Sequence, residues 1–121
     1  MLTNITIEIM IKIKPSDIVE LIGTFFLTAV VIGSGIMAEN LSQGNDAVAL
    51  LGNTISTGAI LFVLIKSFSS ISGAHFNPVV SFIFFIKKEL TLSTFLKYII
   101  FQFFGALLSV LVVHYYFDQQ L

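Results

Sequence analysis

Three uninterrupted apolar runs constrain the fold of this chain more than any other feature of its sequence. They cover residues 18–38, 47–65 and 98–117 and are 21, 19 and 20 residues long. Among Asp, Glu, Lys and Arg, only Glu20 falls within them. A helix rises about 1.5 Å per residue, so each run can cross a hydrocarbon core about 30 Å thick. The sequence predicts three transmembrane helices, at about 17–38, 47–66 and 94–117.

Composition excludes several other classes of protein. Hydrophobic residues make up 56% of the 121 residues and charged residues only 11%, whereas a soluble domain is about a quarter charged. A soluble enzyme, a basic nucleic-acid-binding surface and a disordered tail are therefore excluded. The chain has no cysteine, so it has no disulfide framework or thiolate metal site. No acid pair, nucleophile–base set or metal-ligand cluster appears, and we expect neither an enzyme nor a cofactor or metal.

A fourth apolar segment, residues 77–86, is too short to cross a membrane. Ten helical residues reach about 15 Å, which is half of the hydrocarbon core. Asn77 can cap a helix that starts there, and Pro78 suits the first helical position. The polar stretch 69–75 before it is not expected to be helical. These residues alone leave two interpretations open, an interfacial helix after a surface loop and a half-helix that dips into the membrane. Residues 1–16 are expected to be an N-terminal tail, either an interfacial strand or frayed, before a single domain at 17–121.

Lysine positions predict the orientation of the chain. If the segment 77–86 returns to its side of entry, all six lysines lie on one side of the membrane, whereas the loop 39–46 carries two acids and no lysine. The positive-inside rule makes that side cytoplasmic. The N-terminus is then cytoplasmic and the C-terminus outside.

Three motifs give the sequence a specific resemblance. Residues 72–80, SGAHFNPVV, resemble the signature loop SGAHxNPAV of the aquaporin and glycerol-facilitator family, the major intrinsic proteins, with Val79 in place of the usual Ala. Residues 20–25, ELIGTF, are similar to the first-helix motif ExxGTF. Residues 98–106, YIIFQFFGA, resemble the third-helix motif YxxxQxxGA. The resemblance covers about 17–117, the first half of a fold built from six helices and two half-helices in an inverted repeat.

The resemblance implies an all-α membrane protein with three transmembrane helices and one re-entrant half-helix, half of the aquaporin fold. It implies passive transport of water or small neutral solutes rather than catalysis. Residues 33–39, GSGIMAE, look most like bacterial members, which implies a bacterial inner membrane.

The signature loop is expected to line a pore. Its residues are Gly73, Ala74, His75, Asn77, Pro78 and Val79. The partial positive charge at a helix N-terminus repels cations and protons, while an Asn77 amide donates to a passing water oxygen. The carbonyls of residues 73–75 act as acceptors. A plain helix cap satisfies the same spacing and stays the alternative for Asn77.

Two buried polar residues are expected to brace that loop. A carboxylate inside an apolar span is costly, which makes Glu20 a functional candidate. The resemblance implies that Glu20 accepts hydrogen bonds from backbone N–H groups of the loop and that Gln102 is a buried strut. Proton transfer by Glu20 is the alternative.

The expected filter is uncharged. In the family one filter residue comes from the second helix, where this chain has Thr57, and an Arg usually stands three residues after the Asn of the second loop. Here Val80 stands three residues after Asn77, and the chain has no Arg. A pore made of two copies is lined by Thr57 from one copy and by Ile65, Ala74 and Val80 from the other. Such a filter suits small neutral solutes such as glycerol or undissociated metalloid acids.

Three helices and one half-helix cannot enclose a pore, so the resemblance implies a second, inverted half. An antiparallel homodimer, a separate chain that resembles the second half, and an inactive fragment of a full-length aquaporin stay open. The lysine bias opposes the homodimer, because an inverted copy carries all six lysines to the other side. A non-conducting regulatory subunit is the rival function, and it needs the helices without Asn77. The bilayer is the other partner expected, with a tetramer-like assembly by analogy and no nucleic acid.

Overall fold

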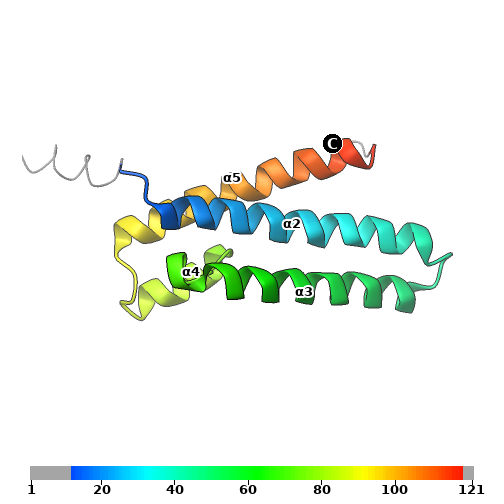
Figure 1. The fold of residues 1–121 in the computed structure, drawn as a ribbon, viewed down its shortest axis with the longest axis horizontal. Coiled ribbons are helices and arrows are strands. Elements are labelled where there is room, and N and C mark those ends of the chain that lie inside the picture. Colours follow the sequence, from blue (N-terminus) through cyan, green and yellow to red (C-terminus); the bar gives the residue numbers. More distant parts are fainter. Residues whose placement is uncertain (1–11, 119–121) are drawn as a thin grey trace, which may run out of the picture.

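The computed structural model describes residues 12–118, and this part of the chain folds into four helices (Figure 1). They are α2 (Pro15–Leu41), α3 (Asp46–Ser72), α4 (Pro78–Ile86) and α5 (Leu92–Tyr116). The first two have 27 residues and α5 has 25, and all three are apolar enough to cross a membrane. With nine residues, α4 reaches less than half of that distance. The predicted all-helical architecture with three membrane-length helices is confirmed.

Of the three long helices α2 is the central one, and it packs against α3 on one side and α5 on the other (Figure 1). The short helix α4 packs against α5. Small residues bring α2 and α5 close together, because a Cβ atom on Gly105 would collide with the backbone carbonyl of Leu21. Ser109, one turn later, is completely buried. Close approach through small residues is how helices associate in lipid, where apolar surface alone gives no driving force.

Gly105→Val is expected to destabilise the helix pair, because the added side chain must push the α2 backbone away. Overpacking costs about 1–3 kcal/mol or more, measurable by titration of the detergent-solubilised protein with sodium dodecyl sulfate. Gly58→Val on α3 is the matched control, since a Cβ atom there meets nothing within 4 Å. Equal loss of stability in the two variants would contradict close packing at Gly105.

The small buried core lies where the segment between α3 and α4 meets the long helices. Its centre is Val19, Leu64 and Phe76. The Phe76 ring covers Gly23 so closely that a Cβ atom on this glycine would collide with it. The glycine of the ELIGTF motif therefore has a packing role, because it admits the loop between the helices.

Two helix ends differ from the sequence prediction. The stretch 69–75 was expected to be non-helical, which is wrong for residues 69–72, because α3 continues to Ser72. It ends there because Gly73 takes a left-handed conformation (φ 87°) and its N–H donates to the carbonyl of Ser69 at 3.0 Å. At the other end, α2 begins at Pro15, inside the stretch expected to be a tail. Residues 1–11 of that tail lie outside the described residues.

Candidate functional site

The segment that joins α3 to α4 has an unusual backbone. Gly73, Ala74 and Phe76 all have positive φ angles, of 87°, 54° and 48°. Residues other than glycine rarely adopt this region, and such conformations persist only where the surroundings hold them. The backbone N–H groups of this segment therefore need partners from other elements.

Glu20 on α2 supplies the partners for two of these N–H groups, those of His75 and Phe76. The side chain is completely buried. Its Oε1 accepts hydrogen bonds from the backbone N–H of His75 at 3.0 Å and from the Ser72 hydroxyl at 2.6 Å. Its Oε2 accepts from the backbone N–H of Phe76 at 2.7 Å and from the Gln102 amide at 2.9 Å. Four donors thus compensate the buried carboxylate, which would otherwise be very costly.

A second set of hydrogen bonds ties α4 and α5 to the same loop. Gln102 on α5 also donates to the Ser81 hydroxyl at 2.9 Å, and that hydroxyl lies 3.0 Å from His75 Nδ1. The Tyr98 hydroxyl donates to the Ser72 carbonyl at 2.8 Å. Sequence reasoning assigned no role to Ser72, Ser81 or Tyr98. A signal existed for Ser81, because it is the only polar side chain in the nine residues of α4.

Asn77 lies at the exposed N-terminus of the half-helix. Its backbone is extended (φ −152°), and its Oδ1 accepts a hydrogen bond from the Val79 N–H at 2.8 Å. Pro78 follows at the first helical position, where it needs no N–H. The cap uses only the oxygen of the carboxamide, so its N–H₂ group is not needed by the cap. The cap and the pore interpretations of Asn77 are therefore compatible.

A groove of about 420 Å³ runs beside Asn77, between α2 and α5. Thr24 and Gln102 line it, and both are buried. Thr24 Oγ1 and Gln102 Oε1 have no hydrogen-bond partner within the described residues. Both atoms are themselves buried, and the surface that the groove exposes is mainly apolar.

The four residues expected to form a filter are spread over three elements. Thr57 is half-buried on α3, and Ile65, further along α3, is 41% exposed. Ala74 packs against the core around Phe76, and Val80 is half-buried on α4. The prediction divides these residues between two inverted halves, so a single chain does not test it.

Comparison with known families agrees with this geometry. The model of the family described as Major intrinsic protein matches residues 10–121. The chain belongs to this family. Major intrinsic proteins are channels rather than enzymes, and with three apolar helices of membrane length this one is a multi-pass membrane protein.

Relatives of this major intrinsic protein are considerably longer than the chain. Aquaglyceroporin AqpS of Rhizobium meliloti (strain 1021) is 46% identical over 101 residues, which cover 84% of this chain and 43% of that protein. Putative aquaporin NIP4-1 of Arabidopsis thaliana is 37% identical over 100 residues, covering 83% and 34%. Aquaporin PIP2-7 of the same plant is 34% identical over 93 residues, covering 77% and 33%. The chain spans less than half the length of these relatives, and no solved structure matches it significantly.

Proposed function

We propose that this chain is half of a membrane channel for water and small neutral solutes, with a pore completed by a second, inverted half. The observation that carries the proposal is the braced loop, which presents Asn77 at the N-terminus of a half-helix. Relatives of the chain are named as an aquaglyceroporin and an aquaporin, which agrees with such a channel.

The arrangement at Asn77 selects for neutral solutes. The helix N-terminus carries about +0.5 of an elementary charge, which repels cations and hydrated protons. The amide group that the cap leaves unused can donate to the oxygen of water or of a hydroxyl group. A lining of donors and acceptors with a positive centre passes neutral molecules and excludes protons.

The groove beside Asn77 supports the presence of a second half. Inverted repeats that meet around a site at the membrane midplane are an established plan for transport proteins. A second half-helix in the groove would cover its mainly apolar wall. That half is a second copy of this chain or a separate chain, and the lysine bias favours a cytoplasmic N-terminus for this one.

The proposed filter admits glycerol as well as water. Thr57, Ile65, Ala74 and Val80 carry no charge and no large aromatic ring, so they leave a wide, weakly selective constriction. We expect measurable glycerol permeability alongside water permeability. A channel that conducts water and strictly excludes glycerol would contradict this filter.

Osmotic shrinkage of liposomes tests the proposed function. The chain is reconstituted alone and together with the C-terminal half of aquaglyceroporin AqpS, and water and glycerol fluxes are measured. Asn77→Asp keeps the capping oxygen but replaces the amide donor by a negative charge, so we expect permeability to fall to that of empty liposomes. Asn45→Asp is the matched control, because the Asn45 side chain also caps a helix, α3, where it accepts from the Val48 N–H at 3.2 Å.

Each outcome of this experiment points to one arrangement. Permeability of the chain alone identifies a second copy as the other half. Permeability only with the AqpS half identifies a separate chain. No permeability in either preparation contradicts the channel and favours a non-conducting subunit. A conducting wild type with an Asn77→Asp variant that conducts equally well contradicts the role proposed for Asn77.

A further inference from the structure

Two hydroxyl groups close to Thr57 on α3 follow a hydrogen-bonding pattern from which Thr57 departs. Thr54 donates to the carbonyl of Leu50 at 2.7 Å, and Ser56 donates to the carbonyl of Gly52 at 2.9 Å. Both are the ordinary bond of a helical hydroxyl to the carbonyl one turn earlier. Thr57 instead donates to the side-chain Oδ1 of Asn53, at 3.2 Å. The Thr57 hydroxyl thus has a side-chain acceptor in place of a backbone carbonyl.

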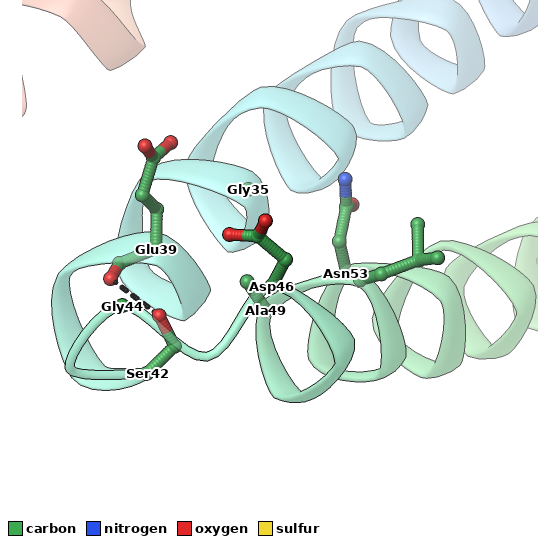
Figure 2. Close-up of a pocket in the computed structure, with 8 residues that line it drawn as sticks. Gly35, Glu39, Ser42, Gly44, Asp46, Ala49 and Asn53 are labelled. Atoms are coloured by element: carbon green, nitrogen blue, oxygen red, sulfur yellow. Dashed lines mark hydrogen bonds between the residues drawn. The ribbon is translucent and has the colours of Figure 1, made fainter.

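Asn53 is held in place by α2. The Ser34 hydroxyl donates to the same Oδ1 at 3.0 Å. The amide nitrogen of Asn53 lies over Gly35, where an added Cβ atom would be 3.4 Å from it. Figure 2 shows Asn53 extending from α3 towards α2, beside Gly35. The carboxamide is therefore clamped between the two helices, and its oxygen is fixed with respect to Thr57.

Asn53 also borders a polar pocket at the turn between α2 and α3. The pocket has a volume of about 510 Å³, and Glu39, Ser42 and Asp46 line it with Asn53 (Figure 2). Thr57 lies one helical turn from Asn53, further from this turn and towards Asn77 along the chain. Asn53 thus lies between the pocket at the α2–α3 turn, which it lines, and the filter residue Thr57, to which it is hydrogen-bonded.

We propose that Asn53 is a positioning residue that sets how Thr57 meets the solute. A threonine hydroxyl has one proton and two lone pairs. With the proton committed to Asn53, and the oxygen drawn away from the helix backbone, Thr57 presents its lone pairs as acceptors. The solute class that fits is a neutral molecule with hydroxyl donors, such as a polyol or an undissociated hydroxy acid. This inference rests on the proposed function, because it takes Thr57 as pore-lining.

Removal of the Asn53 carboxamide should release Thr57 to its ordinary bond. The hydroxyl would then turn to the backbone carbonyl of residue 53, as Thr54 and Ser56 do with theirs. It would keep both lone pairs, but they would no longer point towards the solute. We expect Asn53→Leu to lower the ratio of glycerol to water permeability about three- to tenfold, the size of one neutral hydrogen bond. Thr57→Val, which removes the hydroxyl at nearly constant shape, should give the same change.

The test is a double-mutant cycle. The variants are reconstituted under the condition in which the wild type conducts, either alone or with the AqpS half. Asn53→Leu combined with Thr57→Val should change the ratio no more than Thr57→Val alone. Thr54→Val is the control, since it removes a hydroxyl of the same helix that bonds the Leu50 carbonyl and not Asn53, so its ratio should equal that of the wild type. If Asn53→Leu does not fold, Asn53→Ala removes the same oxygen without added bulk.

The outcomes separate this inference from the proposed function. A conducting wild type with an unchanged ratio in the Asn53 variant overturns the inference alone. A further change from Asn53→Leu in the Thr57→Val background also overturns it, because Asn53 would then act through the fold. A wild type that conducts in neither preparation overturns the proposed function and the inference with it.

Discussion

Glu20→Gln should release the loop between α3 and α4 while the three long helices remain. Four donors converge on the two carboxylate oxygens of Glu20. A glutamine offers one oxygen and turns its own N–H₂ group towards the remaining donors. Two buried donors then lose their acceptor at about 1–3 kcal/mol each. The strained backbone at Ala74 and Phe76 depends on these bonds, so the loop is the part that gives way.

Hydrogen exchange at the backbone amides of His75 and Phe76 measures this effect directly. Both amides donate to Glu20 in the wild type, and we expect their protection to fall strongly in Glu20→Gln. Permeability should fall in parallel, because Asn77 follows Phe76 directly. Glu39→Gln on the same helix is the control, since Glu39 is exposed and should leave both readouts unchanged. Protected amides in Glu20→Gln would show that packing of Phe76 alone holds the loop.

The long helices were predictable because their cause is local in the sequence. Whether a segment can cross lipid as a helix depends on its own length and on the apolar character of its own side chains. Hydropathy did not distinguish α4 from an interfacial helix. The re-entrant half-helix came from the resemblance of residues 72–80 to a known loop, together with two flanking motifs.

The bonds that hold the site were less predictable because they join residues far apart in the chain. Ser72 and Gln102 reach Glu20 across 52 and 82 residues. The Ser72 bond helps to explain why α3 continues through a polar stretch that local composition assigns to a loop. Asn53 was missed for a similar reason, since its anchor Ser34 lies on another helix. In each case the sequence shows a polar residue in an apolar context, but it does not show which distant residue is its hydrogen-bond partner.

Lys97→Met should cost far more stability than its place among the six lysines suggests. From the sequence, Lys97 serves only as one of the lysines that set the orientation in the membrane. In the structure its Nζ lies 3.1 Å from Asp17 Oδ2, and the side-chain exposures of Lys97 and Asp17 are 8% and 0%. The same Asp17 oxygen accepts the backbone N–H of Lys14 at 2.9 Å. Removing one partner of a buried pair leaves an uncompensated charge and costs about 3–5 kcal/mol. Unfolding by sodium dodecyl sulfate, followed by circular dichroism, measures the loss.

The chain contains its own control for this prediction. Lys87 and Glu89 form a shorter pair, at 2.9 Å, with side-chain exposures of 58% and 47%. Lys87→Met should cost only about 0–1 kcal/mol, since water and salt screen exposed pairs. Equal losses in Lys87→Met and Lys97→Met would contradict the burial of the second pair.

A double variant separates the two roles that a buried ion pair can have. Asp17→Asn with Lys97→Met removes both charges and keeps an oxygen for the Lys14 N–H. Because buried pairs return little net stability after desolvation, we expect this variant to recover most of the loss seen in Lys97→Met. Recovery of stability with unchanged permeability would mean that the pair adds little to the function of the fold. Recovery of stability with lost permeability would instead mean that the pair fixes the register of α2 against α5. Glu20 and Gln102, which brace the loop together, lie on those two helices.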